Sequence, residues 1–352
     1  RSFTAFASHL PFHTYFEVRS ERMRIAVLIS SFLVLLLLPT AHASSQLPVL
    51  RVGVLTYGTL NWELDIAKQD APENVGYQLE LVPLGSPQAL TIALQGGAVD
   101  MIIGDWLWAA RQHLHQREFY FYPYSTAAGT LIASPALSNQ SIKALDGKTL
   151  GIAGGKANKN YILYRAYALK QFNVDIASIT TIKFAAPPML NSLLKRGDID
   201  AVLTFWHYAA VLTNDNYTPM LTMQDILNSF GIQKEVPVLG WLFKREWGDQ
   251  HAELVNAFLQ RSYAIRSMLN KQDDMWKNIN SFTSKYPASV QPALISAYRA
   301  GIPTRWGPAT WQDMQTILRV IKQYDDAQTL TGQLDTLPTS LFWQNTVLGS
   351  HE

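Results

Sequence analysis

The feature that most constrains this fold is a repeat whose two copies start 100 positions apart, at residues 88–110 and 188–210. The copies read QALTIALQGGAVDMIIGDWLWAA and PMLNSLLKRGDIDAVLTFWHYAA, and they align without a gap. The identical pairs are Leu90/Leu190, Leu94/Leu194, Gly97/Gly197, Asp100/Asp200, Trp106/Trp206, Ala109/Ala209 and Ala110/Ala210. A chain that repeats such a unit is expected to build two similar halves.

Each copy has the same physical pattern. Leucines four residues apart form the buried stripe of a helix, and the glycine at 97 or 197 ends that helix in the left-handed conformation. The apolar runs Met101–Ile103 and Ala201–Leu203 then predict short buried strands, and a second helix begins at the tryptophan. Asp100 and Asp200 open these strands at the edge away from any ligand, so we interpret them as turn residues.

Further strands are predicted upstream of each copy, at Leu50–Leu55, Leu79–Leu84, Thr149–Ala153 and Ile179–Phe184. Pro87 and Pro187-Pro188 follow two of these strands and suit the first turn of a helix. The pattern is therefore β-α-β-α-β twice, an α/β fold with mostly parallel sheets flanked by helices. Sheets of this kind bind ligands at the carboxyl ends of their strands.

The segments between and after the copies predict how the two halves are joined. Phe119–Pro135 contains two β-rich pieces, which predict an edge strand followed by a crossing to the second half, and Glu235–Phe243 predicts the return. Helical periodicity follows at Ala252–Leu269, Asp273–Thr283, Val290–Ala300 and Thr310–Tyr324. We expect two lobes, a cleft and a double hinge; the alternative is one doubly wound domain with an accidental repeat.

The N-terminal region predicts export. Met23-Arg24 precedes the apolar run Ile25–Leu38, which is shorter than the roughly 20 residues of a membrane span, and Ala41-His42-Ala43 provides a small-x-small cleavage site. We expect a signal peptide at 23–43, cleaved between Ala43 and Ser44, and upstream translation at 1–22. An uncleaved anchor or a core helix is the alternative.

These elements predict the domain organisation and the compartment. Lobe one should comprise residues 44–130 and 242–352 with the C-terminal helices, and lobe two residues 131–241. We expect a periplasmic monomer without stable membrane insertion.

Composition excludes several classes of function. The chain has no cysteine, which excludes disulfides, thiolate metal sites and a lipid anchor on cysteine. Only 16% of residues are charged and the formal net charge is +2, which argues against a nucleic-acid partner. No catalytic residue, metal site or cofactor is predicted.

The order of these parts resembles the type II periplasmic solute-binding proteins of ABC importers, in the branch for nitrate, alkanesulfonates, taurine and thiamine precursors. The resemblance rests on the export signal, on Tyr57-Gly58-Thr59-Leu60-Asn61-Trp62 after the first strand, on both repeat copies, and on LDGKTLGI at residues 145–152. It implies a non-enzymatic receptor that captures a small organic solute and delivers it to a membrane permease with its ATPase. The alternative is a fold-sharing enzyme such as a chorismate-dehydratase-like lyase, which would lack the export signal.

Candidate ligand-binding residues follow the ends of the predicted strands. Lobe one offers Tyr57, Asn61, Trp62, Asp105 and Trp106, and lobe two offers Gly154, Lys156, Asn158, Asn160, Tyr161, Trp206 and His207. Aromatic faces and amides suit a neutral or zwitterionic heteroaromatic or amino-organic solute, while Lys156 beside glycines leaves a sulfonate open.

Three of these candidates have alternative roles. Trp106 and Trp206 fit a core position as well as a ligand contact, and His207 fits a helix cap or a packing position. Trp62 has no obvious core to join from its place at the strand end, so we expect it to stack against the ligand.

Overall fold

The computed structural model describes residues 47–344 apart from 156–157, 326–327 and 329. The predicted signal peptide, its cleavage site and the predicted upstream segment all lie outside the described residues. The described residues belong to one compact unit of the chain. Within them, no helix combines the length and the apolar character that a membrane crossing requires.

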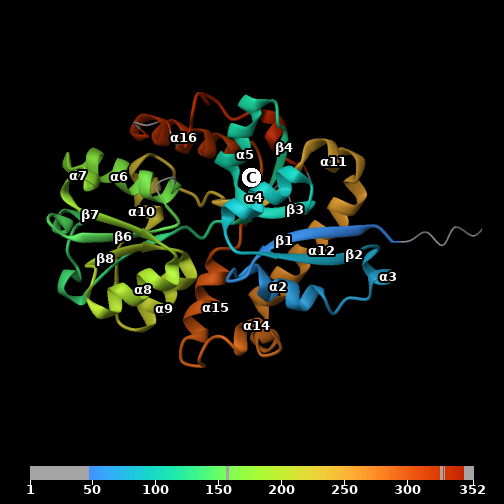
Figure 1. Cartoon of the computed structure of the whole chain (residues 1–352), viewed down its shortest axis with the longest axis horizontal. Helices are drawn as coiled ribbons and strands as arrows, with labels where there is room; N and C mark the ends of the chain where they lie inside the picture. Colours follow the sequence, from blue (N-terminus) through green and yellow to red (C-terminus); the bar gives the residue numbers. More distant parts are fainter. Residues whose placement is uncertain (1–46, 156–157, 326–327, 329, 345–352) are drawn as a thin grey trace, which may run out of the picture. The chain divides into compact units, whose positions relative to one another are not determined.

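The first sheet has the strand order β2-β1-β3-β10-β4. Strands β1, β2 and β3 are parallel, and β10 runs antiparallel between β3 and β4. Helices α2 and α4 lie on opposite faces of this sheet (Figure 1). The elements from the first strand to the first crossing are β1 (Val49–Leu55), α2 (Leu60–Ala67), α3 (Pro72–Val75), β2 (Gln78–Leu84), α4 (Pro87–Gly96), β3 (Met101–Asp105), α5 (Trp106–Gln112), η1 (His113–His115) and β4 (Phe119–Ser125).

The second sheet repeats this arrangement with the order β7-β6-β8-β5-β9. Here β5 is the antiparallel strand, and it lies between β8 and β9. Helices α6 and α7 cover one face, and α8 and α9 cover the other (Figure 1). The elements are β5 (Thr130–Ala133), η2 (Pro135–Leu137), η3 (Ile142–Leu145), β6 (Thr149–Ala153), α6 (Lys159–Phe172), α7 (Ile176–Ile179), β7 (Thr181–Ala185), α8 (Pro187–Arg196), β8 (Ala201–Thr204), α9 (Trp206–Asn214), β9 (Thr218–Leu221) and α10 (Met223–Ser229).

The internal repeat corresponds to equivalent elements of the two sheets, as predicted. Helices α4 and α8 end at Gly97 and Gly197, whose φ angles of 75° and 77° are left-handed and favour glycine. The aspartates after them also have equivalent roles: Asp100 accepts a hydrogen bond from the Arg51 N–H, and Asp200 accepts one from the Thr149 N–H, each at 2.8 Å. Each aspartate therefore joins the start of one strand to its parallel neighbour.

Two crossings connect the sheets, and they lie side by side. Residues 125–130 lead from β4 to β5, and residues 230–238 lead back to β10 (Leu239–Lys244). The Val238 N–H donates to the Ser125 carbonyl at 2.8 Å, which joins the crossings to each other. The fold is thus the two-lobed α/β architecture with a double hinge.

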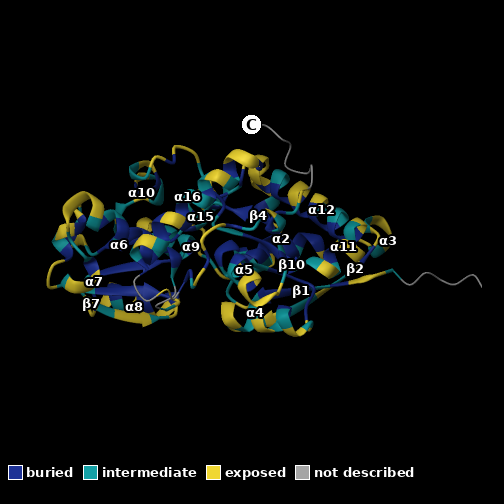
Figure 2. Ribbon diagram, turned by 90° about the horizontal axis from the view of Figure 1, so that it is seen from above, coloured by how far each residue is buried: buried dark blue, intermediate teal, exposed yellow. Residues whose placement is uncertain are grey.

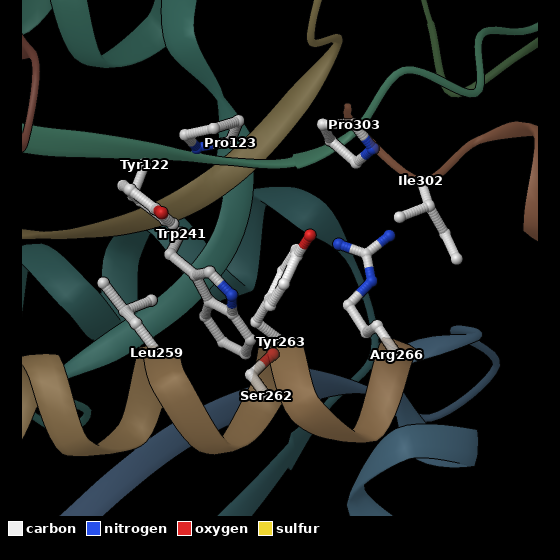
Figure 3. Close-up of a pocket in the computed structure, with 9 residues that line it drawn as sticks. All are labelled: Tyr122, Pro123, Trp241, Leu259, Ser262, Tyr263, Arg266, Ile302 and Pro303. Carbon is white, nitrogen blue, oxygen red and sulfur yellow. The ribbon is translucent and has the colours of Figure 1, made fainter. Parts of the chain in front are cut away.

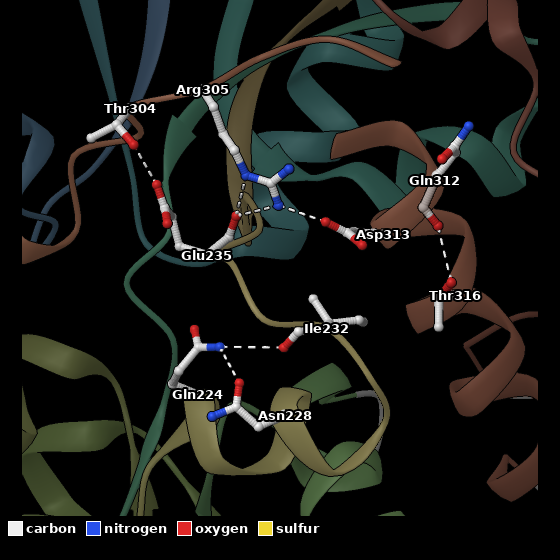
Figure 4. Close-up of polar contacts among 9 residues, drawn as sticks. All are labelled: Gln224, Asn228, Ile232, Glu235, Thr304, Arg305, Gln312, Asp313 and Thr316. Atoms are coloured by element: carbon white, nitrogen blue, oxygen red, sulfur yellow. Dashed lines mark hydrogen bonds and ion pairs between the residues drawn. The ribbon is translucent and has the colours of Figure 1, made fainter. Parts of the chain in front are cut away.

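A segment near the C-terminus fastens both crossings. The Thr126 N–H donates to the Gly301 carbonyl at 2.9 Å. The buried Arg305 donates to the Glu235 carbonyl at 3.0 Å and to the Asp313 carboxylate at 2.6 Å (Figure 4). Residues 301–305 therefore hold the two hinge segments in register.

The remaining C-terminal helices pack on both lobes. They are α11 (Arg245–Gln250), α12 (Ala252–Lys271), α13 (Asp273–Trp276), α14 (Asn280–Thr283), α15 (Gln291–Ala300), α16 (Pro308–Tyr324) and η4 (Thr339–Leu341). Helix α12 contacts α2 of lobe one, whereas α15 and α16 contact α9 and α6 of lobe two. Figure 2 shows buried strands in both sheets beneath helices with exposed outer faces.

The single helix expected at Asp273–Thr283 is wrong, because the chain forms two short helices there. The break falls between Trp276 and Asn280. Trp276 and Ile279 are both buried, with Ile279 in an extended conformation, so the chain leaves the helix to bury both side chains.

Candidate functional site

A cavity of about 620 Å³ lies where the two crossings meet the strand ends of both lobes. Its size suits a small organic molecule. Lobe one contributes Trp106 at the end of β3, and lobe two contributes the start of α6 and one side of α9. The crossings, β9, α10, α15 and α16 contribute the rest of the wall, with small residues predominating at 126–130 and 293–301.

Lys159 is the main polar group that joins the lobes at this cavity. It is the first residue of α6, and its side chain is only 6% exposed. Its Nζ donates to the Asp105 Oδ1 at 2.9 Å and to the Val238 carbonyl at 3.1 Å, and it lies 4.5 Å from the centre of the Trp106 ring. Burial lowers the pKa of Lys159, while Asp105 opposes that shift by favouring the ammonium form.

Asn160, the next residue, brings an unused hydrogen-bonding atom to the same wall. Among the described residues, its buried Oδ1 has no hydrogen-bond partner. The facing position is Gly129, where a Cβ would lie 2.9 Å from the Asn160 Nδ2, closer than such atoms normally approach. A glycine in the first crossing is therefore required for Asn160 to face the cavity.

Trp62 and Trp206 come from different lobes and meet edge to face, with ring centres 6.0 Å apart. Trp206 lines the cavity. Trp62 is 2% exposed and also packs against Trp276, Phe282, Tyr286 and Tyr298. The expectation that Trp62 has no core to join is wrong, since the C-terminal helices supply one; its contact with a ligand stays a prediction.

His207 lies beside Trp206 in α9 and is 5% exposed. Neither ring nitrogen has a hydrogen-bond partner in the part of the chain that the structure describes. Burial, with a smaller contribution from the charge of Lys285, lowers the pKa of His207 to about 3. The ring is therefore neutral at physiological pH.

Three of the predicted ligand contacts shape the loops after strands. The Asn61 side chain donates to the carbonyls of Leu55 and Gly58, both at 2.9 Å. The Asn158 side chain caps α6 by accepting from the Tyr161 N–H, and it donates to the Ala153 carbonyl at 2.8 Å. Gly154, with φ 93°, turns the same loop. A ligand contact of these residues stays a prediction.

The other predicted residues lie in different surroundings. Trp106 is fully buried, donates from its indole N–H to the Pro237 carbonyl at 3.1 Å, and lines the cavity. Tyr161 is buried in the core, and burial raises its pKa to about 12. Tyr57 is half-buried on the loop after β1. Lys156 lies outside the described residues.

Sequence reasoning missed much of the cavity wall. Lys159 is not among the predicted binding residues, although it lies between Asn158 and Asn160, which both are. The sequence predicts the crossings as connections between the lobes but not as part of the cavity wall. Helices α10 and α15 have no polar sequence pattern that would identify them as lining a cavity. Of the predicted residues that the structure describes, Trp106, Asn160 and Trp206 line the cavity directly.

A second buried polar cluster lies in lobe one and serves packing. The Glu63 Oε1 accepts from Tyr298 at 2.7 Å and from Tyr124 at 2.8 Å, and lies 3.5 Å from the Arg266 Nε. Burial raises the pKa of Glu63, whereas Arg266 and the two tyrosines act in the opposite direction. The cavity beside Arg266 measures about 10 Å³, room for one water but not for a solute (Figure 3).

No protein-family model matches the chain, and no curated protein matches it. Solved structures do match. The aliphatic sulphonate-binding protein SsuA from Escherichia coli aligns with a TM-score of 0.66 at 12% identity, over 85% of this chain and 99% of that one.

Two further structures agree with that match. The alkanesulfonate-binding SsuA from Xanthomonas axonopodis, bound to MOPS, gives a TM-score of 0.64 at 15% identity, over 84% of this chain and 98% of that one. The nitrate-binding protein NrtA from Synechocystis gives a TM-score of 0.59 at 11% identity, over 82% of this chain and 84% of that one. The fold is that of the periplasmic binding proteins, as the sequence resemblance implied.

The packing of Trp62 predicts a stability effect. Trp62→Ala is expected to lower the free energy of unfolding by about 3–5 kcal/mol, because it leaves a hole among five aromatic rings. Urea unfolding of the ligand-free protein measures it. Trp206→Ala, at a half-buried position, is the matched control and should cost less. An unchanged midpoint for Trp62→Ala would contradict this packing.

The environment of His207 predicts a pH effect. Its folded pKa of about 3 lies below the unfolded value of about 6.5, so the unfolded chain binds the proton first as pH falls. The stability attributed to neutral His207 is complete above pH 6.5 and is lost towards pH 3. Between pH 7.5 and 4.5, wild type should lose about 2–3 kcal/mol more than His207→Leu in urea unfolding. Equal losses would show that His207 is not buried as described.

Proposed function

We propose that this protein is the substrate-binding protein of an ABC transporter, which captures a small organic solute between its lobes and delivers it to a membrane permease. The observation that carries this proposal is the 620 Å³ cavity at the double hinge, whose wall includes Trp106 from lobe one and Trp206 from lobe two. A solute there contacts both lobes at once. Binding energy can then favour the closed arrangement of the lobes over the open one.

The fold supports the same role. Neighbouring structures include proteins described as binding sulphonates and nitrate, and one described as the ligand-binding component of an ABC-type import system from Staphylococcus aureus. A permease and its ATPase are accordingly the proposed partners, and a monomer is the proposed form. We infer binding without turnover, because the described lining residues offer aromatic faces, amides and one ion pair, groups that suit recognition of a solute.

The proposed lobe boundaries follow the predicted domains: residues 44–130 and 242–352 form lobe one, and residues 131–241 form lobe two. The proposed compartment is the periplasm, reached through cleavage between Ala43 and Ser44. The proposed ligand contacts are the residues that the sequence predicts at the strand ends. Trp106, Asn160 and Trp206 are the main ones, because they line the cavity.

This proposal predicts capture without chemistry and a change of shape. The exported protein, incubated with a metabolite extract and examined by native mass spectrometry, should retain one solute whose mass stays constant over hours. Small-angle scattering should give a smaller radius of gyration with that solute, because the lobes close on it. Conversion of the solute, or binding with no change in scattering, would contradict the proposed role.

A further inference from the structure

Lobe one and the second crossing form a site with the features of an ammonium-binding pocket. The Asp105 carboxylate and the Val238 carbonyl both accept from one ammonium group, at 2.9 and 3.1 Å, and the face of Trp106 lies 4.5 Å from that group. An anion, a carbonyl oxygen and an indole face are the three partners that stabilise a desolvated ammonium ion.

The ammonium group in this pocket belongs to lobe two. Lys159 lies at the start of α6, directly after the loop that follows β6, so its position depends on lobe two. The side chain of lysine is a four-carbon alkylammonium. When the lobes separate at the double hinge, Lys159 moves with α6, whereas Asp105 and Trp106 stay together at the junction of β3 and α5.

The charges of the cavity favour a cation over an anion. Among the described residues that line it, the charged ones are Lys159 and Glu235. Lys159 is matched by Asp105, and the Glu235 carboxylate accepts a hydrogen bond from the neutral Thr304 hydroxyl. One cation therefore stands beside two carboxylates, and an added anion would lack a positive partner here.

We propose that the solute carries an organic ammonium group, which binds to Asp105, Val238 and Trp106, and that Lys159 is an internal competitor for this pocket. This inference rests on the proposed function and names the chemical class of the solute. Lys159 occupies this pocket in the absence of solute, and without a cation there the partly exposed Asp105 carboxylate would keep its hydrogen bond from the Leu107 N–H but lose its charged partner. The solute's ammonium displaces Lys159, while Trp206 supplies a second aromatic face for the rest of the molecule.

The test uses three four-carbon probes with different polar groups: n-butylammonium, butane-1-sulfonate and butanamide. Calorimetry compares their binding to wild type, Lys159→Ala and Lys159→Ala/Asp105→Asn, with circular dichroism to check folding. Lys183→Ala, at an exposed lysine of β7, is the matched control. n-Butylammonium should bind Lys159→Ala at least about ten-fold more tightly than wild type, because the competitor is gone, and Asp105→Asn should reverse that gain.

The contradicting results are equally definite. Failure of n-butylammonium to bind Lys159→Ala, or binding that survives Asp105→Asn, would overturn the pocket. The wild-type protein provides a test that does not depend on the folding of any variant. If it binds butane-1-sulfonate or butanamide more tightly than n-butylammonium, the proposal that the solute carries an ammonium group is wrong. If a neutral or anionic metabolite is retained and the lobes close on it, only the ammonium inference fails. If no solute from any extract changes the scattering, the proposed function fails instead.

Discussion

Two parallel neighbouring strands need a crossover connection that returns the chain to the starting edge, and this constraint determines where the cavity lies. Every parallel strand of a sheet then ends at the same edge. Here β3 ends at Asp105 and Trp106, and β8 ends beside Trp206. The loops at these ends are free of the sheet's hydrogen bonding, so the polar and aromatic groups of both lobes gather at one place. The cavity is a consequence of strand direction.

The hinge between the lobes lies at the same place. The two crossings are bonded to each other through Val238 and Ser125, and residues 301–305 bond to both of them. The lobes also meet through the ion pair of Asp105 with Lys159 and the edge-to-face contact of Trp62 with Trp206. Helices α15 and α16 pack on α9 and α6 of lobe two as well. Crossings held together in this way define an axis about which the lobes can turn.

Much of the fold could be predicted because the repeat encodes it locally. Leucine spacing, a stop at Gly97 or Gly197, and a short apolar run specify helix, turn and strand without reference to the rest of the chain. The surroundings of Trp62 could not be predicted in this way. Its partners Trp276, Phe282 and Tyr298 lie more than 200 positions away, and no local pattern reveals that they fold back onto α2. Lys159 could not be predicted for a related reason, since its partners Asp105 and Trp106 belong to the other lobe.

The absence of cysteine makes the central claim, that the lobes close on a solute, directly measurable. Gln88→Cys on α4 and Met189→Cys on α8 place one spin label on each lobe, at exposed positions of equivalent helices. Pulsed electron paramagnetic resonance then gives the distance between the labels with and without the solute that the protein retains from an extract. A shorter and narrower distance distribution on binding is the result this account predicts, and an unchanged distribution at saturating solute would contradict it.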